Sequence, residues 1–180
     1  MRVLIIGGGG REHALAWRLA QSPLAPELFA SPGNPGIARL AICLPAPKYL
    51  HSYAGLAETH RIDLTVVGPE VPLVAGLVDN FRSCGLKIVG PTRAAALLEG
   101  SKLFAKEFFF RAGIPTARSI TSINASSFPL VIKADGLAAG KGVVIAQDRS
   151  EAEEALRRLG PDVILEEYLE GEEVSFIGLS

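Results

Sequence analysis

The chain opens with an apolar run that ends directly in glycines and continues into helix formers. Val3 to Ile6 are four consecutive apolar residues, Gly7 to Gly10 follow, and Glu12 to Ala20 carries an apolar stripe at helical spacing. Glycines let the backbone approach other groups closely, and the free N–H groups of a helix N-terminus attract anions such as a sugar phosphate. The segment predicts a strand, a tight turn and a helix, with either an anion or no ligand at the turn.

The same pattern recurs further along the chain. Asp63 to Val67 predicts a buried strand, Gly68 to Glu70 a turn, and Pro72 the start of a helix, because a proline ring suits the first helical position. Three further strands are expected, at Leu28 to Ala30, Ala41 to Leu44 and Leu86 to Val89. Short apolar strands that alternate with helices indicate a parallel sheet. Residues 1–100 are therefore predicted to form a small doubly wound α/β domain.

The character of the sequence changes after a predicted helix at Ser101 to Ala112, which Gly113 and Pro115 end. A linker is expected near residues 113–120, so that residues 101–120 form a helix and linker and residues 121–180 a second domain. The elements predicted there are the strand LVIKAD from Leu130, the strand VVIAQD from Val143, a helix from Ser150 to Leu159, and the strands VILEEYL from Val163 and EVSFIGL from Glu173. Strands joined by short loops form hairpins, so this half is predicted to be α+β with antiparallel pairing.

Composition and charge exclude several classes of protein. The 180 residues include 18 Lys and Arg against 19 Asp and Glu, and the resulting net charge of −1 argues against a nucleic-acid partner. No apolar run reaches the roughly 18 residues of a membrane span, and the N-terminal run is too short for a secretion signal. A cytoplasmic protein without a membrane partner is expected. Cys43 and Cys84 are predicted to be buried free thiols, and neither the cysteines nor the three histidines show metal-ligand spacing.

Two glycine-rich loops depart from the common nucleotide-binding motifs. The first carries Glu12 where a dinucleotide fingerprint needs its third small residue, and no acidic residue follows the second strand, which argues against an NAD-dependent dehydrogenase. The second, Gly136 to Gly142, is one residue too short for a Walker loop and is flanked by strands. It is either a flap over polyphosphate, with backbone N–H groups and the Lys141 ammonium as donors, or a solvated hairpin.

Lys133 is a single cation within the apolar strand LVIKAD. Burying a charge without a partner costs much free energy, so a bound phosphate is one candidate partner, and a solvent-facing side chain is the alternative. The acidic stretch from Glu166 to Glu173 is either part of the same site or an ordinary solvated turn.

Eight segments, in order along the chain, resemble the phosphoribosylamine–glycine ligase family of the ATP-grasp superfamily. They are GGGGREHALAW (7–17), SPGNPG (31–36), IDLTVVGPEVPLVAGLVD (62–79), GLKIVGPT (85–92), LEGSKLFAK (98–106), GIPTA (113–117), VIKADGLAAGKGVV (131–144) and ILEEYLEGEEVSFI (164–177). The resemblance implies a small doubly wound parallel-sheet domain followed by the first α+β lobe of an ATP-grasp domain. Two stretches look shortened relative to the family, around Asn124 to Phe128 and Leu159 to Asp162.

The resemblance implies a carbon–nitrogen ligase of purine synthesis. ATP would phosphorylate the glycine carboxylate, and the amine of 5-phosphoribosylamine would attack the acyl phosphate to give glycinamide ribonucleotide, ADP and phosphate. Such sites work mainly by positioning and by neutralising phosphate charge. Mg²⁺ would be required, with its ligands expected beyond residue 180. Another ATP-grasp carboxylate–amine ligase and a non-catalytic nucleotide- or phosphosugar-binding module are the alternatives.

The resemblance also implies residues for two binding sites, although it assigns no catalytic residue. The expected ATP contacts are Lys102, Lys133, Gly136, Ala139, Gly140, Lys141, Gly142, Glu166, Glu167, Tyr168, Leu169 and Glu173. Among them the two lysines would meet phosphates, Glu166 to Leu169 would be the adenine hinge, and Glu173 would accept from the ribose hydroxyls. In the first domain, the expected phosphoribosylamine contacts are Gly9, Gly10, Arg11, Asn34 and Glu70. Glu70 would face the amine, Asn34 would line the pocket, and the other three would meet the phosphate.

The resemblance further predicts that the chain is an N-terminal portion of such a ligase. It ends at Ser180 within a predicted strand, and no acidic pair resembles the metal-ligand segment of the second ATP-grasp lobe. We therefore expect the chain to be inactive alone and to need a segment or separate chain that supplies this lobe.

Overall fold

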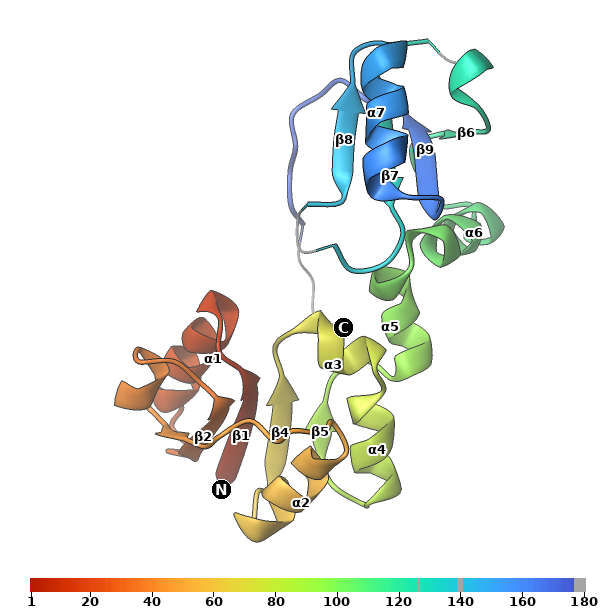
Figure 1. Ribbon diagram of the computed structural model, residues 1–180. Helices are drawn as coiled ribbons and strands as arrows, with labels where there is room; N and C mark the ends of the chain where they lie inside the picture. The colour runs from red at the N-terminus through yellow and green to blue at the C-terminus, as the bar shows by residue number, and fades with distance from the viewer. Residues whose placement is uncertain (126, 139–140, 177–180) are drawn as a thin grey trace. The chain divides into compact units, whose positions relative to one another are not determined.

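The computed structural model describes residues 1–125, 127–138 and 141–176. The chain forms two compact units, Met1–Gly100 and Ser101–Ser180, whose elements are drawn in Figure 1. The finer division predicted from the sequence, with a helix and linker over residues 101–120, stays a prediction.

The first unit is built on a five-stranded parallel sheet with the strand order β3-β2-β1-β4-β5. Figure 1 labels four of these strands, β2, β1, β4 and β5. The strands are β1 (Arg2–Gly7), β2 (Glu27–Pro32), β3 (Ile42–Cys43), β4 (Leu64–Val67) and β5 (Ile88–Val89). All five predicted strands of this unit are confirmed. The central strand, β1, aligns Gly7 with Pro32 of β2 and Ile6 with Val67 of β4, so that three strands end at the same edge.

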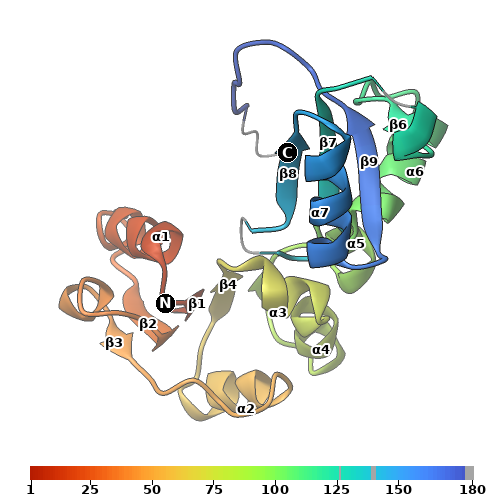
Figure 2. The ribbon, with the colours of Figure 1, turned by 45° about the horizontal axis from the view of Figure 1, so that its top comes forward.

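Helices cover both faces of this sheet, as Figure 2 shows for α1 (Gly10–Ala20) and α2 (Ser52–Thr59). On the α1 face, Ile5 of β1 packs with Ala16 and with Ile37 of the short 3-10 helix η1 (Ile37–Arg39). On the opposite face, Leu4 packs with residues of α2 and of α4 (Leu77–Ser83), such as Phe81. Because side chains alternate along a strand, β1 serves two cores. The predicted doubly wound arrangement is confirmed.

The helix after β4 begins earlier than its proline suggests. The helix α3 (Glu70–Val74) has Pro69 as its N-cap, so Pro72 is the third helical residue and the predicted start at Pro72 is wrong. The first N–H groups of a helix have no intrahelical partner, so a proline is tolerated there as well. The helix stops before Gly76, which has a φ of 90°, and α4 follows. The helix α5 (Arg93–Gly100) packs on α3, and its Gly100 lies against Val74.

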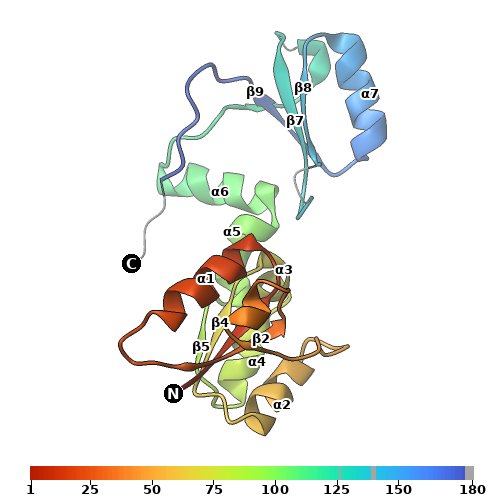
Figure 3. The same cartoon turned by 90° about the vertical axis from the view of Figure 1, so that its left-hand side faces the viewer.

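The second unit is built on a four-stranded antiparallel sheet with the order β6-β9-β7-β8. The strands are β6 (Ser119–Ile120), β7 (Leu130–Ala134), β8 (Val143–Ala146) and β9 (Val163–Glu167), and a short 3-10 helix, η2 (Ile123–Ala125), follows β6. The helix α7 (Arg149–Leu159) lies along one face (Figure 3), where its Ala152 and Ala155 pack with Leu130 and Ile132. The predicted α+β architecture is confirmed, although β6 was not predicted.

The helix α6 (Lys102–Ala112) has the ends that its sequence predicts. Ser101 accepts a hydrogen bond from the backbone N–H of Phe104, and Gly113 ends the helix with a φ of 66°. A serine N-cap satisfies one of the free N–H groups, and glycine adopts the left-handed conformation without steric cost.

Two further sequence predictions are wrong. Residues 173–176 of the predicted strand EVSFIGL form no strand, because none of the described strands pairs with them; its other residues lie outside the described part of the chain. Cys43 and Cys84 are free but exposed, since one lies in the two-residue edge strand β3 and the other caps the end of α4. Among the described residues, no helix is long and apolar enough to cross a membrane.

Candidate functional site

Three loops meet at the carboxyl edge of the parallel sheet in the first unit. The side-chain amide of Asn34, after β2, donates to the carbonyl of Gly8, after β1, at 2.9 Å. The Arg11 guanidinium donates to the carbonyl of Gly68, after β4, at 2.6 Å. The sheet order changes direction between β1 and β4, and open α/β sheets bind ligands at such a point. This edge is therefore the candidate ligand site of the first unit.

Glu12 organises the glycine-rich loop at this edge. Its side chain is buried, and its carboxylate accepts a hydrogen bond of 2.6 Å from the backbone N–H of Gly9. A Cβ atom on Gly7 would lie 2.7 Å from the Glu12 carboxyl carbon, and one on Gly68 would collide with the same carboxylate. Both glycines are therefore required by the packing of Glu12. The sequence signal for Glu12 was its position in the broken dinucleotide fingerprint.

Arg11 and Glu70 face each other across this edge. The guanidinium and carboxylate are 3.7 Å apart, and the two side chains are 66% and 41% exposed. Exposed pairs of this kind contribute about 0–1 kcal/mol to stability, so both groups remain available to a ligand. Gly10 begins α1 with open space around its Cα. The five predicted residues Gly9, Gly10, Arg11, Asn34 and Glu70 thus come together, offering donors for an anion and a carboxylate for an amine.

The second unit holds a buried carboxylate between two lysines. Glu166 of β9, whose side chain is 6% exposed, lies 2.9 Å from the Lys106 ammonium through Oε1 and 2.6 Å from the Lys133 ammonium through Oε2. Burial acts to raise the pKa of Glu166, but its hydrogen bonds to Lys106 and Lys133 and their charges outweigh burial and lower that pKa. The carboxylate stays ionised, and the three groups carry one excess positive charge.

This arrangement changes the interpretation of Lys133. The sequence suggested a phosphate partner or a solvent-facing side chain, whereas the structure gives the ammonium a carboxylate partner in the same chain. The antiparallel register aligns Lys133 with Ile164, so that Glu166 lies on the same face two residues along. The Lys133 side chain is 32% exposed, and Glu166 is its one partner among the described residues. Because an ammonium has three N–H donors, Lys133 keeps donors for a ligand.

The base of the second glycine-rich loop is joined to the N-terminus of α6. The Lys102 ammonium donates to the carbonyls of Ala134 and Gly136 at 2.8 and 2.7 Å. Asp135 accepts from the backbone N–H groups of Lys102 and Leu103 at 2.6 and 3.2 Å, and from the Ser101 hydroxyl. Burial acts to raise the Asp135 pKa, but these hydrogen bonds outweigh it and lower that pKa. Lys102 and Asp135 therefore fix where the loop starts.

The loop closes on itself at the other end. The backbone N–H of Ala134 donates to the Gly142 carbonyl at 2.7 Å, and that of Lys141 donates to the Ala138 carbonyl at 2.9 Å. A Cβ atom on Gly142 would collide with the Ala138 side chain. Packing within the loop therefore accounts for a glycine at this position, and no ligand is needed to explain it. The predicted contacts Ala139 and Gly140 lie outside the described residues.

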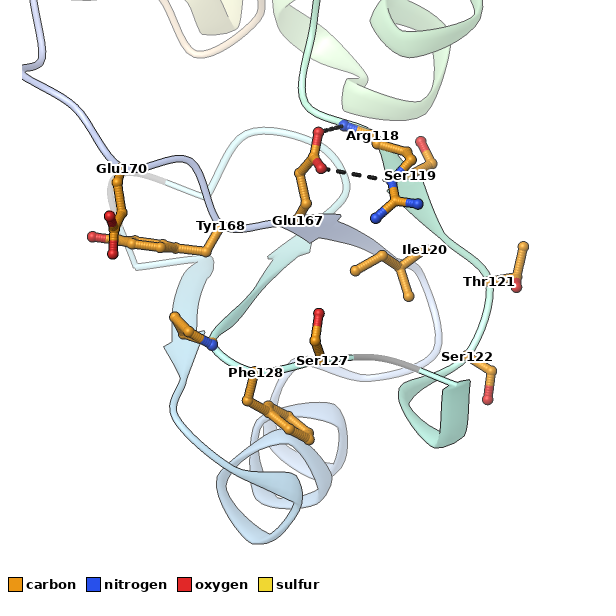
Figure 4. A pocket seen from close by; sticks show the side chains of 11 residues that line it. Arg118, Ser119, Ile120, Thr121, Ser122, Ser127, Phe128, Glu167, Tyr168 and Glu170 are labelled. Carbon is orange, nitrogen blue, oxygen red and sulfur yellow. Dashed lines mark hydrogen bonds and ion pairs between the residues drawn. The ribbon is translucent and has the colours of Figure 1, made fainter.

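The remaining predicted ATP contacts do not gather around the lysines. Consecutive residues of a strand point to opposite faces, and Glu167 pairs with Arg118, accepting from its backbone N–H at 2.7 Å. Glu167, Tyr168 and Glu170 line a cavity of about 610 Å³ that Ser and Thr side chains also border (Figure 4). Leu169 and Glu173 are exposed. No group of three possible metal-binding His, Cys, Asp or Glu side chains occurs in the part of the chain that the structure describes.

Two charged residues of the second unit, Lys106 and Asp135, are not among those predicted from the sequence. Lys106 lies four residues after Lys102 on α6, and residues with this spacing share one face of a helix. Asp135 stands two residues after Lys133. The helical spacing was a usable signal for Lys106, whereas the capping role of Asp135 depends on a helix that is distant in sequence.

Two family models match the chain from end to end. Residues 1–99 match "Phosphoribosylglycinamide synthetase, N domain", and residues 100–180 match "Phosphoribosylglycinamide synthetase, ATP-grasp (A) domain". The phosphoribosylamine–glycine ligase of Xylella fastidiosa strain 9a5c is 50% identical over 200 residues, covering 99% of this chain and 46% of the relative. That of Escherichia coli O6:H1 is 48% identical over 198 residues, with 98% and 46% covered. The chain spans about half the length of these relatives.

Solved structures agree with these matches. The crystal structure of phosphoribosylamine–glycine ligase from Thermotoga maritima has a TM-score of 0.75 at 31% identity, covering 96% of this chain and 45% of that one. N5-carboxyaminoimidazole ribonucleotide synthetase from the same organism has a TM-score of 0.70 at 21% identity, covering 94% and 46%. The second match shows a shared fold alone.

Proposed function

Since the chain belongs to the phosphoribosylglycinamide synthetase family, we propose that it carries the phosphoribosylamine site and the first ATP-binding lobe of a ligase. In the proposed reaction, ATP phosphorylates the carboxylate of glycine. The amine of 5-phosphoribosylamine then displaces phosphate from the acyl phosphate, giving glycinamide ribonucleotide and ADP. A carboxylate needs this activation because its oxygen is a poor leaving group, and the enzyme contributes positioning and charge neutralisation.

The excess positive charge around Glu166 is the observation that carries the nucleotide part of the proposal. Two ammonium groups share one carboxylate there, and the more exposed one belongs to Lys133. A polyphosphate is a strong acceptor for such a group, and the glycine-rich loop Gly136 to Gly142 is proposed to add backbone N–H donors beyond that of Lys141, which is bonded to Ala138. Lys102 has a third ammonium proton beyond the two held by carbonyls, and we assign it to a phosphate as well.

The segment from Glu166 onward is proposed to hold the adenine and the ribose. The backbone of Glu166 to Leu169 is proposed to bond the adenine edge, and Glu173 to accept from the ribose hydroxyls. The side chains of Glu167 and Tyr168 line the cavity of Figure 4, so we give them no role in holding phosphate. The described residues supply no clear donor set for Mg²⁺, and no step is assigned to the metal.

The first unit is proposed to hold 5-phosphoribosylamine at the carboxyl edge of its sheet. Gly10 presents a backbone N–H group at the start of α1, where the helix dipole favours an anion, and Arg11 adds a guanidinium. The N–H of Gly9 already donates to Glu12, so Gly9 is proposed to contribute the close approach of its backbone to the phosphate. Glu70 is proposed to accept from the substrate amine. Asn34 holds the loop, because its amide donates to Gly8 and accepts from the N–H of Ile37.

The proposed ligase activity is tested by adding the part of the ligase that the relatives contain and this chain does not. We expect the purified 180-residue chain to release no ADP in the presence of glycine, ATP, Mg²⁺ and phosphoribosylamine. Mixing it with the remaining part of the Xylella fastidiosa relative, folded separately, is expected to restore glycine-dependent ADP release. Turnover by the chain alone, or a correctly folded mixture without turnover, would contradict the proposal. A cytoplasmic location stays a prediction.

A further inference from the structure

The Lys106 ammonium, unlike that of Lys133, has an acceptor for each of its three N–H groups. Its three N–H donors have three acceptors: the Glu166 carboxylate at 2.9 Å, the Thr116 hydroxyl at 3.1 Å and the Ala117 carbonyl. An ammonium has three donors and no acceptor, so Lys106 has nothing left to offer a ligand. Its side chain is also only 13% exposed. Lys106 is therefore a fixed counter-charge for Glu166 rather than a ligand contact.

Lys106 sets the net charge that an anion meets at Lys133. With Lys106 in place, one carboxylate oxygen faces each ammonium, so Glu166 is shared between two cations. Without Lys106, Glu166 would have Lys133 as its single counter-ion in the cluster. Lys133 and Glu166 together would then carry no net charge. An anion approaching Lys133 would then meet a neutral pair in place of a group with a net positive charge. At a separation of about 4 Å, one such charge changes anion affinity by roughly fivefold in bulk water and by more where water is partly excluded.

We propose that Lys106 is a positioning residue that holds Glu166 and offsets its charge, and thereby keeps the positive charge of Lys133 available for a phosphate chain. This inference rests on the proposed nucleotide role of Lys133. It assigns to Lys106 no contact with the nucleotide, because its donors are already occupied within the chain. The required ligand chemistry is a polyphosphate, whichever base it carries.

The test uses inorganic tripolyphosphate, which has the phosphate charge of a nucleotide and no adenine to contact the hinge. The dissociation constant for the 180-residue chain is measured by ¹H–¹⁵N NMR titration. Lys106→Met is expected to raise that constant about tenfold, and the double variant Lys106→Met/Glu166→Gln to return it to within about threefold of the wild-type value. Glu166→Gln alone is expected to lower it severalfold. Lys87→Met, at an exposed lysine of the first unit, is the charge-matched control and should leave it unchanged.

Each outcome decides for or against the inference. If Lys133→Met abolishes binding while Lys106→Met has no effect, the nucleotide role of Lys133 survives and the inference fails. If the double variant binds as weakly as Lys106→Met, Lys106 has a structural role only. If Lys133→Met has no effect on binding, the proposed nucleotide site fails together with the inference. Should Lys106→Met not fold, as judged from its spectrum, an unchanged affinity in Glu166→Gln overturns the inference on its own.

Discussion

The two units of this chain prepare their candidate sites in opposite ways. In the first unit, backbone groups and an exposed pair, Arg11 and Glu70, converge at the carboxyl edge of a parallel sheet. In the second, a buried carboxylate is held between two lysines on an antiparallel sheet. Exposed charges can be changed with little effect on folding, whereas removal of one member of a buried cluster leaves unpaired charge. Binding and stability should therefore be separable in the first unit and coupled in the second.

The largest effect is expected for Glu166→Ala. The substitution leaves Lys106 and Lys133 without their counter-charge, and breaking a buried ionic cluster in this way costs about 3–5 kcal/mol. Urea unfolding followed by circular dichroism and by the fluorescence of Trp17, the single tryptophan, checks this. Because Trp17 lies in the first unit, its transition should move less than the circular dichroism transition. Equal unfolding of wild type and variant would show that the cluster contributes nothing to stability.

A smaller loss is expected for Glu12→Ala in the first unit. The variant removes the acceptor of the Gly9 N–H and opens space beside Gly7 and Gly68, and the loss of a helix cap alone costs about 1 kcal/mol. The Trp17 fluorescence transition in urea reports this change directly. Glu58→Ala, at an exposed position of α2, is the matched control. If Glu12→Ala is as stable as Glu58→Ala, Glu12 does not stabilise the loop.

Acid should affect the second unit through Glu166 and Asp135. Both pKa values are lowered in the folded chain, so these groups stabilise it above their ordinary titration range, and this contribution is lost as the pH falls through the lowered values. The circular dichroism midpoint in urea should therefore fall as the pH is lowered below about 4. In Glu166→Gln the fall should be shallower, since one of the two groups no longer titrates. An identical pH dependence in wild type and variant would contradict the lowered pKa of Glu166.

The smallest effect on stability is expected for Arg11→Ala. The side chain is largely exposed, but its hydrogen bond to the Gly68 carbonyl is lost, so the free energy of unfolding should fall by about 0.5–1 kcal/mol. Binding of ribose 5-phosphate, followed by NMR titration, should nevertheless weaken severalfold. Arg18→Ala, on the exposed part of the same helix, controls for net charge. If both variants bind ribose 5-phosphate like the wild type, Arg11 has no role in the proposed site.

The sequence was informative where a local pattern determines the structure. Apolar runs placed the strands of both sheets, and Ser101 and Gly113 marked the ends of α6, because caps and burial act over a few neighbouring residues. Pro72 misplaced the start of α3, since a proline is tolerated at more than one position of the first turn. The two-residue strand β6 has no periodicity to detect. Its pairing with β9 arises only in the folded unit.

The same distinction between local patterns and long-range packing applies to the candidate sites. The five predicted residues of the first unit follow parallel strands that end at one edge, so topology alone brings them together. The partner of Lys133 lies 33 residues further along the chain, and that of Lys106 lies 60 residues further. Such pairs depend on strand register and helix packing, which no local pattern specifies. The sequence therefore identified Lys133 and Glu166 as candidates but did not show that they form one cluster.

An ATP titration of the ¹⁵N-labelled 180-residue chain tests most directly whether the second unit holds the nucleotide. We expect amide shifts in residues 133–142 and 166–169, weak affinity, and loss of the shifts in Lys133→Ala, whose spectrum should otherwise show an intact fold. Shifts confined to residues 1–100, or identical shifts in wild type and Lys133→Ala, would contradict this expectation.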